Sequence, residues 1–277
     1  MPQDVLQDMF DLIDIQPWIK NHSGELTDLW NICDTREEQL LLKTLISDFC
    51  MFDQQKEILA CKKIDEKIQS WGLSYKNTWI VATANAGEVD GSTAGLQKLK
   101  NKIHPTDDWH LRTIGNIPAA VAKIKDGDTI VLFDDFIGSG KTMVRKKNWL
   151  NSLLEKEKIK EVKYYFLAFS GMKFGIDHIR LNTGCEVYSH ISLQKAITEK
   201  YDVLEASHMT TTMRTIEAKL GVTYKRKKIA EYSLGYEESE ALYCVQNDNC
   251  PNNVFPILWW PLLKDGTRLR TLLTRAG

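Results

Sequence analysis

The chain has 277 residues, of which 43% are hydrophobic and 26% are charged, a composition typical of soluble globular proteins. Its formal net charge is −1, so the overall charge of the protein does not favour binding to a membrane surface or to nucleic acid. Nucleic acid remains possible only through a local group of charges. No apolar run approaches the ~18–20 residues that span a bilayer, and the N-terminus lacks the basic region of a secretion signal. We therefore expect a soluble, cytoplasmic protein.

The chain contains six cysteines, and no two of them form a C-x-x-C pair. Most lie in apolar stretches that are typical of helices or strands. This pattern favours reduced structural thiols in a cytosolic setting. A bridge between Cys244 and Cys250 is the alternative.

Residues 1–72 have the apolar spacing of helices and no strand pattern. Thr35 and Glu38 form a capping-box pattern directly before an apolar run. A second helical pattern covers residues 53–71 and stops at Gly72, a plausible C-cap. We predict a helical N-terminal region over residues 1–72.

Residues 73–200 alternate between short apolar runs and helical patterns. We expect strands at 79–84, 130–133, 162–170 and 185–190, and helices at 94–103, 118–124, 141–157 and 174–181. The run 130–133 is apolar throughout, as expected for a strand buried on both faces of a parallel sheet. The alternation predicts an α/β core with a parallel sheet.

Residues 201–277 predict an α+β extension. A helix is expected at 209–220, and strands at 242–245 and 254–260. Trp259 and Trp260 could stack on a nucleobase, but tryptophan burial usually dominates core packing, so we favour the core.

The segment 129–142 carries the clearest chemical signal. Its strand delivers Asp134 and Asp135 to the carboxyl end of a parallel sheet, where ligands of open α/β sheets bind. A phosphate loop follows, formed by Gly138, Ser139, Gly140, Lys141 and Thr142. Glycines permit close backbone approach, hydroxyls donate to phosphate oxygens, and the start of a helix favours an anion. The carboxylates can accept hydrogen bonds from vicinal hydroxyls or reach a hydrated Mg²⁺. The segment therefore predicts a ribose-phosphate site.

Two alternatives compete for the same residues. A Walker A loop requires glycine five positions before Gly140, where this chain has Asp135, and no later strand ends in a Walker B aspartate. A P-loop nucleotidase is therefore the less favoured interpretation. An ordinary glycine-rich turn between a strand and a helix would not require paired aspartates.

The segment resembles the PRPP motif of type I phosphoribosyltransferases. That motif consists of a hydrophobic strand, two acidic residues, two mostly apolar residues and a short phosphate loop. Here these parts are Ile130–Phe133, Asp134 and Asp135, Phe136–Ile137, and Gly138–Thr142. The resemblance implies a parallel-sheet phosphoribosyltransferase-like core at 73–200, with a C-terminal hood at 201–277. It also implies Mg²⁺ as cofactor and glycosyl transfer at C1′ of PRPP or a nucleotide, with the two aspartates as catalytic and metal-holding residues.

The family also holds pyrophosphate in an earlier loop, and the stretch 88–95 occupies that place. The resemblance assigns Gly91, Ser92 and Thr93 to this role, because their amides and hydroxyls can donate to phosphate oxygens. The alternative is a simple helix N-cap by Asp90 or Ser92.

One position departs from the family's purine-salvage enzymes. Those enzymes have an aspartate that acts as general base where this chain has Gly138. A general base must lie within hydrogen-bond reach of the nitrogen that it serves, and glycine has no such group. This departure disfavours purine salvage and leaves open a non-catalytic sensor of PRPP or a nucleotide.

The segment 233–260 resembles the C-terminal part of phosphoribosyltransferase-like proteins of bacterial conflict systems, including some retron and other antiphage loci. This resemblance implies an effector in antiphage defence. It also implies partner proteins from the same system, and a homo-oligomer is possible.

Two polar groups carry weaker signals. His104, Asp107, Asp108 and His110 could hold Zn²⁺ or Mn²⁺, although a polar loop is favoured. Such a loop could close over the site, so that His110 or Arg112 contacts pyrophosphate. The basic run 225–228 suits nucleic acid or an acidic partner, but a solvated surface is favoured.

Overall fold

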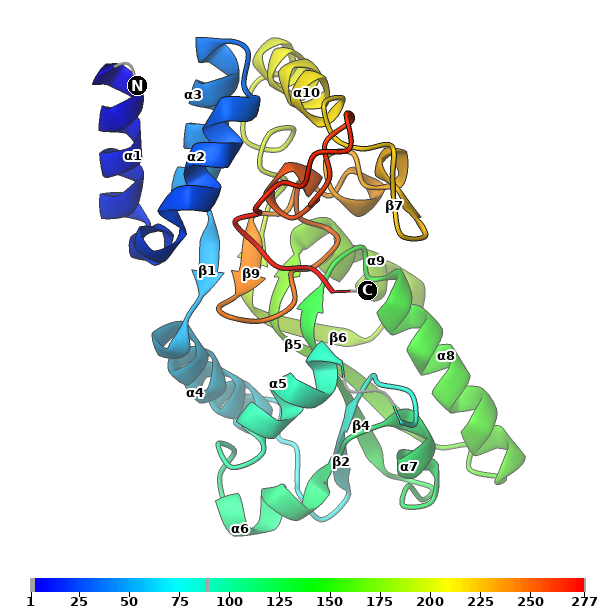
Figure 1. The fold of residues 1–277 in the computed structure, drawn as a ribbon. Coiled ribbons are helices and arrows are strands. Elements are labelled where there is room, and N and C mark those ends of the chain that lie inside the picture. The colour runs from blue at the N-terminus through cyan, green and yellow to red at the C-terminus, as the bar shows by residue number, and fades with distance from the viewer. Residues whose placement is uncertain (1–2, 88–89, 277) are drawn as a thin grey trace. The chain divides into compact units, whose positions relative to one another are not determined.

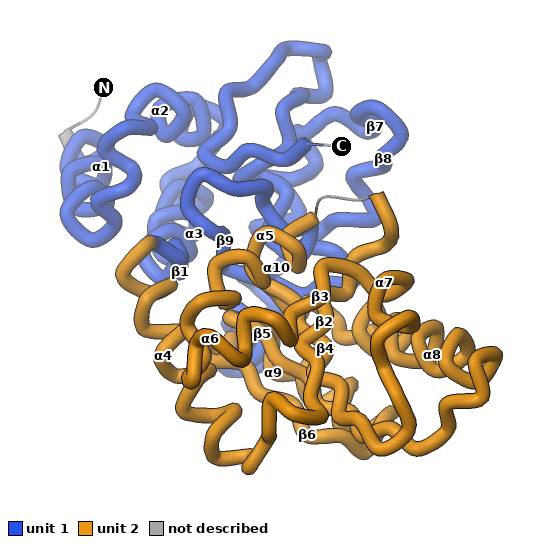
Figure 2. The backbone as a smooth tube through the Cα atoms, turned by 90° about the horizontal axis from the view of Figure 1, so that it is seen from below, with its two compact units in different colours: residues 1–53, 194–277 blue, residues 54–193 orange. Residues whose placement is uncertain are grey.

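A computed structural model describes residues 3–87 and 90–276 of the chain (Figure 1). The chain forms two compact units, which Figure 2 colours separately. Unit 1 contains residues 1–53 and 194–277, and unit 2 contains residues 54–193. These boundaries differ from those of the three predicted segments, because both ends of the chain share one unit and residues 54–72 join the sheet. Residues 1–2, 88–89 and 277 of those segments lie outside the described residues.

Unit 2 is built on a five-stranded sheet with the order β3-β2-β4-β5-β6. Each neighbouring pair of strands is parallel. The strands are β2 (Thr78–Ala82), β3 (Thr113–Ile114), β4 (Thr129–Ile137), β5 (Lys163–Met172) and β6 (Glu186–Leu193). The predicted α/β fold with a parallel sheet is thus confirmed. The two-residue strand β3 is too short to give a sequence pattern.

Helices flank this sheet (Figure 1). They are α4 (Gln54–Ser70), α5 (Gly91–Leu99), α6 (Thr106–Trp109), the 3₁₀ turn η2 (His110–Arg112), α7 (Ile117–Val121), α8 (Lys141–Lys156) and α9 (Lys173–Thr183). Leu132 of β4, Leu150 of α8 and Ile179 of α9 belong to one buried core cluster. Full burial of each such side chain contributes roughly 1.5–3 kcal/mol. After α4, the Trp71 ring packs 4.7 Å from the Tyr165 ring of β5, which attaches this segment to the sheet.

Strand β4 is longer than the sequence predicts. Beyond Phe133 it continues to pair with β5, as Asp134 with Ala168 and Ile137 with Gly171. The two aspartates therefore lie within the strand and not after it. The predicted helix 141–157 is confirmed almost residue for residue by α8. The helix predicted at 94–103 begins earlier and ends earlier, as α5 (Gly91–Leu99), because Asp90 caps it.

Unit 1 contains mainly helices and short strands. They are α1 (Gln3–Ile15), η1 (Pro17–His22), α2 (Ser23–Ile32), α3 (Arg36–Ser47), β1 (Cys50–Phe52), α10 (Val203–Glu217), β7 (Thr223–Tyr224), β8 (Lys227–Lys228), η3 (Ile229–Glu231), η4 (Tyr236–Glu238), β9 (Tyr243–Val245) and η5 (Pro256–Leu258). The capping box is confirmed, because the Thr35 hydroxyl accepts the Glu38 N–H at 3.2 Å. The Glu38 carboxylate in turn accepts the Asp34 N–H at 2.7 Å.

Several predictions for this unit need correction. Strand β1 lies in a region where no strand was expected, because it has three residues and its parallel partner β9 is distant in sequence. The strand expected at 254–260 is wrong. Only Val254 forms a bridge, and η5 follows, because Pro256 has no N–H for a ladder. The helix expected at 209–220 begins at Val203, because Asp202 caps it.

The tryptophan pair and the cysteines lie mostly in the interior. Trp259 and Trp260 are 3% and 0% exposed, so the preference for the core is confirmed. All six cysteines lie in the described part of the chain, and none of them forms a disulfide. The Cys244–Cys250 bridge is therefore wrong. Within residues 3–87 and 90–276, no helix has the length and apolar character needed to cross a membrane.

Candidate functional site

The candidate site lies at the carboxyl end of β4, the central strand of the sheet. The Asp134 carboxylate is held on both oxygens. Its Oδ2 accepts the Thr83 hydroxyl at 3.1 Å, and its Oδ1 accepts the backbone N–H of Asp135 at 3.0 Å. Thr83 follows β2, so two adjacent strands fix one carboxylate. A carboxylate held in this way is oriented before any ligand arrives.

The electrostatics of the aspartate pair are unusual. Burial raises the pKa of the Asp134 carboxyl well above its usual range, and the negative charge of Asp135 raises it further. The hydrogen bond from Thr83 opposes this effect. Two like charges this close do not ionise independently. A cation or a pair of hydroxyl donors at this point would allow both carboxylates to ionise, so the pair suits a metal or a diol.

Helix α5 packs directly against the second carboxylate. A Cβ atom added at Gly91 would lie 2.4 Å from Oδ1 of Asp135, and one added at Gly95 would lie 3.3 Å from the Asp135 Cβ. A side chain at position 91 would therefore displace the Asp135 carboxylate from its present place. The contact brings the predicted pyrophosphate loop to the aspartate pair.

The hydroxyls of that loop serve the helix cap. The Asp90 carboxylate accepts the Thr93 N–H at 3.1 Å and the Ser92 hydroxyl at 2.7 Å. The Thr93 hydroxyl lies 3.3 Å from the same carboxylate. The N-cap alternative therefore describes the arrangement in this structure. A phosphate role for Gly91, Ser92 and Thr93 remains a prediction. Glu88 and Val89 of the same loop lie outside the described residues.

The phosphate loop is short and closely packed. It spans residues 138–140, and its Gly140 has a φ of +77°, a left-handed conformation that favours glycine. A Cβ atom at Gly140 would lie 2.3 Å from the Gly175 carbonyl oxygen, and one at Gly175 would lie 1.9 Å from the Gly138 carbonyl oxygen. Loop and helix α9 thus meet backbone to backbone. Ser139 is half-buried, and Lys141 and Thr142 are exposed at the start of α8.

Three residues of this site are not among those predicted from the sequence. The role of Gly175 depends on its packing against the loop. In the sequence, its only distinguishing feature is that it is a glycine in the first turn of a predicted helix. Lys146 of α8 donates to the Asn85 side-chain oxygen at 2.7 Å. Thr83 could have been found, because aligning the strands from Thr78 and Thr129 places it beside Asp134.

Comparisons with known proteins identify the family of this chain. The family model PRTase-CE matches residues 15–268. The chain belongs to the PRTase-CE family. This family is phosphoribosyltransferase-like, so the resemblance inferred from the β4–α8 segment is confirmed at that level. No curated protein matches the chain. Among solved structures, a hypothetical protein from Neisseria gonorrhoeae with bound ppGpp is similar, with a TM-score of 0.35 and 13% identity over 60% of this chain and 95% of that chain.

The geometry of this PRTase-CE protein speaks against the P-loop alternative. A Walker A loop would begin at Asp135, but β4 continues through Ile137. Only three residues separate the strand from α8. Such a short connection cannot wrap a polyphosphate as the longer Walker A loop does.

The polar group 104–112 of the PRTase-CE chain does not gather into one site. His104 lies 2.7 Å from the Asp65 carboxylate. The Arg112 guanidinium stacks 4.5 Å from the Trp79 ring centroid. In the described parts of the chain, no cluster of three or more histidine, cysteine or acidic side chains could hold a metal. The zinc or manganese alternative for this group is therefore not supported. A pyrophosphate role for His110 or Arg112 remains a prediction.

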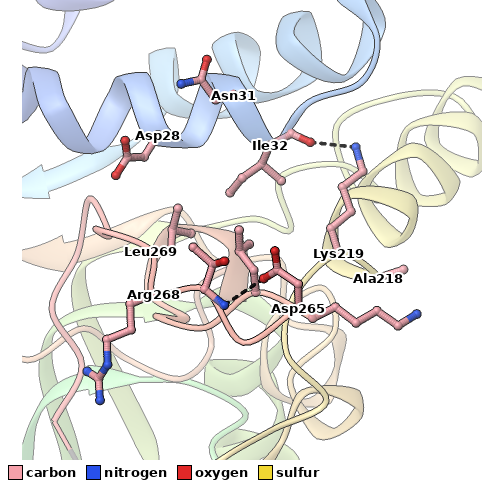
Figure 3. Close-up of a pocket in the computed structure, with 11 residues that line it drawn as sticks. Asp28, Asn31, Ile32, Ala218, Lys219, Asp265, Arg268 and Leu269 are labelled. Atoms are coloured by element: carbon pink, nitrogen blue, oxygen red, sulfur yellow. Dashed lines mark hydrogen bonds between the residues drawn. The ribbon is translucent and has the colours of Figure 1, made fainter.

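Unit 1 of the PRTase-CE protein has a separate cavity of about 690 Å³ (Figure 3). Two of its charged groups are paired within the fold. The Lys219 amine donates to the Ile32 carbonyl and to Glu38, both at 2.8 Å. Asp28 accepts from Arg270 at 2.7 Å. The described residues that line the cavity lack the glycine loop at a helix start and the paired carboxylates that mark the β4–α8 segment, so that segment remains the candidate site.

Proposed function

We propose that this PRTase-CE protein binds PRPP or a related nucleotide at the β4–α8 segment and acts on the bond at ribose C1′. One observation carries the proposal. The paired aspartates Asp134 and Asp135 lie near the end of the central strand, separated by two residues from a glycine loop that opens a helix. Paired carboxylates suit a diol or a cation, and a loop at a helix start suits phosphate.

The binding roles follow from the chemistry of each group. The loop amides of residues 138–142 and the hydroxyls of Ser139 and Thr142 donate to the 5-phosphate. Asp134 and Asp135 accept the ribose hydroxyls. Gly91, Ser92 and Thr93 take the pyrophosphate, which requires the two hydroxyls to exchange Asp90 for phosphate oxygens.

The same two carboxylates fit a magnesium ion. Like charge and burial make this pair unfavourable as two free anions, and a divalent cation removes that cost. Asp134 and Asp135 would hold the ion directly or through water. When bound, Mg²⁺ neutralises charge on the phosphates.

The reaction is transfer at C1′. The bond from C1′ to the leaving oxygen breaks, its electron pair departs with pyrophosphate or another leaving group, and the sugar gains positive charge. Oriented carboxylates stabilise that charge. The acceptor forms a new bond to C1′ and loses a proton. Gly138 has no side chain that could take this proton. The acceptor therefore either lies near another general base or reacts without one. A base, a protein side chain, a nucleic acid and water are the candidate acceptors.

A second candidate function is a non-catalytic sensor of PRPP or a nucleotide. The absence of a proton acceptor at Gly138 favours it. A sensor needs the phosphate loop and the ribose contacts, but it needs no base. Binding without turnover distinguishes the sensor from the enzyme.

The resemblance of segment 233–260 supports a cytoplasmic role in antiphage defence. In this proposal the protein acts as an effector, alone or as a homo-oligomer, and partner proteins of the same system control it. Phage plating on cells that carry the native gene neighbourhood tests the role. Wild-type protein should reduce plaque formation, and Asp134→Asn should restore it. Equal plaque counts in both strains would contradict the role.

The direct test is calorimetric titration with PRPP and Mg²⁺, combined with an assay for released pyrophosphate. Wild-type protein should bind PRPP, and Asp134→Asn and Asp135→Asn should bind about 10-fold to 100-fold more weakly, as expected when hydrogen bonds to charged groups are lost. Asp177→Asn is the matched control, because Asp177 is exposed on α9. If wild-type protein binds PRPP but releases no pyrophosphate with any acceptor, the sensor is supported. If wild-type protein does not bind PRPP, both proposals are overturned.

A further inference from the structure

The hairpin β7–β8 of unit 1 carries four consecutive basic residues, Lys225, Arg226, Lys227 and Lys228. Figure 2 labels its two strands. They pair antiparallel, with Tyr224 opposite Lys227. Lys225 has a φ of +54°, as a two-residue hairpin turn requires. Lys225, Arg226 and Lys228 are exposed. The fold therefore holds a concentrated positive charge on a fixed tip.

The base of this hairpin rests on a buried aromatic cluster. The Tyr224 ring packs 6.2 Å from the Trp260 ring, which lies 5.6 Å from the Trp259 ring. Tyr232 packs edge-on against Trp259 at 5.5 Å. Ring pairs in these arrangements contribute about 0.5–1.5 kcal/mol each beyond their burial. The basic tip is thus anchored and not a loose surface loop.

Arg275 adds a cation to the same place. Its guanidinium lies 5.4 Å from the Trp259 ring centroid and donates to the Cys250 carbonyl. Its Nε is buried and has no hydrogen-bond partner among the described residues. Burial lowers the pKa of Arg275. The Tyr224 ring at the base of the hairpin packs on Trp260, the neighbour of Trp259, so Arg275 lies beside the hairpin base.

A partly buried guanidinium with an unsatisfied N–H destabilises a fold unless an acceptor or an anion compensates it. In the described chain, the Arg275 guanidinium contacts the Cys250 carbonyl and the Trp259 ring, and no ion pair joins it to a carboxylate. The planar guanidinium fork matches phosphate oxygens. A single phosphate would need only Arg275. The exposed cations of the tip extend the charge beyond one phosphate.

We propose that the β7–β8 hairpin and Arg275 bind the phosphate backbone of a nucleic acid without sequence preference. The nearby tryptophans are buried, so they cannot stack on bases, and the site reads charge alone. The overall charge of −1 gives no indication of this site, because acidic residues elsewhere in the chain balance its positive charge. The inference does not depend on the ribose-phosphate proposal, because every residue that it uses lies in unit 1.

Fluorescence anisotropy with labelled 20-nucleotide RNA and DNA strands tests this site on the full chain. The triple variant K225Q/R226Q/K228Q should bind about 100-fold more weakly near 0.1 M salt, with a salt slope smaller by about 2, as expected for three lost phosphate contacts. K156Q/K158Q/K160Q removes three exposed charges elsewhere and should bind like wild type. Equal losses in both triple variants, or no binding by wild type, would overturn the proposal.

Arg275→Met separates binding from folding. It should weaken oligonucleotide binding about 5-fold near 0.1 M salt, while thermal melting stays the same or rises, because an uncompensated cation is removed. Competition with inorganic phosphate identifies the source of the phosphate. Displacement of the oligonucleotide only at high phosphate concentration supports a polymer ligand. Arg275-dependent binding of free phosphate, with no binding of oligonucleotide, contradicts it.

Discussion

Gly175→Ala is the sharpest test of how the phosphate loop is held. The added Cβ would lie 1.9 Å from the Gly138 carbonyl oxygen and 3.1 Å from the Gly140 nitrogen. Real Cβ contacts are not shorter than 3.0 Å, so loop and helix must separate by about 1 Å. Overpacking of this kind costs about 1–3 kcal/mol of folding free energy. A displacement of about 1 Å in a positioning group can cost about 100-fold in function.

Urea unfolding and PRPP titration measure the two effects separately. Gly115→Ala is the matched control, because a Cβ at Gly115 would meet nothing within 4 Å. The control should leave PRPP binding unchanged and alter stability by less than about 1 kcal/mol. Gly175→Ala should lose stability and bind PRPP about 100-fold more weakly. If Gly175→Ala folds and binds as wild type does, α9 does not hold the loop and the loop backbone does not hold phosphate.

Three further predictions concern titratable groups. Burial raises the pKa of Glu217 from 4.5 to about 7, so the free energy of unfolding should fall by about 3 kcal/mol as the pH rises between these values. Urea titrations at several pH values measure this dependence, and Glu217→Gln should abolish it. A dependence that persists in the variant would contradict the assignment to Glu217. The pKa of Asp134 is also raised, so the stability of the wild-type protein declines as the pH rises through that pKa. Asp134→Asn should therefore have a higher melting temperature than wild type at neutral pH, although it binds PRPP more weakly. A lower melting temperature would refute this prediction. Thr83→Val removes the hydrogen bond that lowers the pKa of Asp134. Mg²⁺-dependent PRPP binding should therefore weaken more at lower pH than at higher pH in a titration series. An effect of the same size at every pH would contradict this role of Thr83.

The sequence predicts the centre of the site well, because the relevant signals are local. A continuous apolar run predicts β4, and the acidic pair with its glycine loop predicts the ligand class. Helix α8 follows from the same stretch, with its first residue correctly placed at Lys141. The resemblance to phosphoribosyltransferases rests on these residues, and the PRTase-CE match agrees with it.

The remainder depends on contacts between distant residues. Gly175 matters only because it meets Gly138 in space. Strand β1 is visible only through β9, which lies far away in the sequence. The helical spacing of residues 53–71 predicts that Trp71 belongs to an N-terminal segment, but its packing on Tyr165 places it with the sheet. Periodicity and capping signals report on neighbours along the chain, and they carry no information about such partners.

The central claim is that Asp134 and Asp135 hold the ribose of a phosphoribosyl ligand. Titration of PRPP with Mg²⁺ into wild-type protein and into the double variant Asp134→Asn/Asp135→Asn tests it most directly. We predict saturable binding by wild type and a loss of about 100-fold or more in the folded double variant. Equal affinity in both proteins, or no binding of PRPP or any nucleotide by wild type, would contradict the claim.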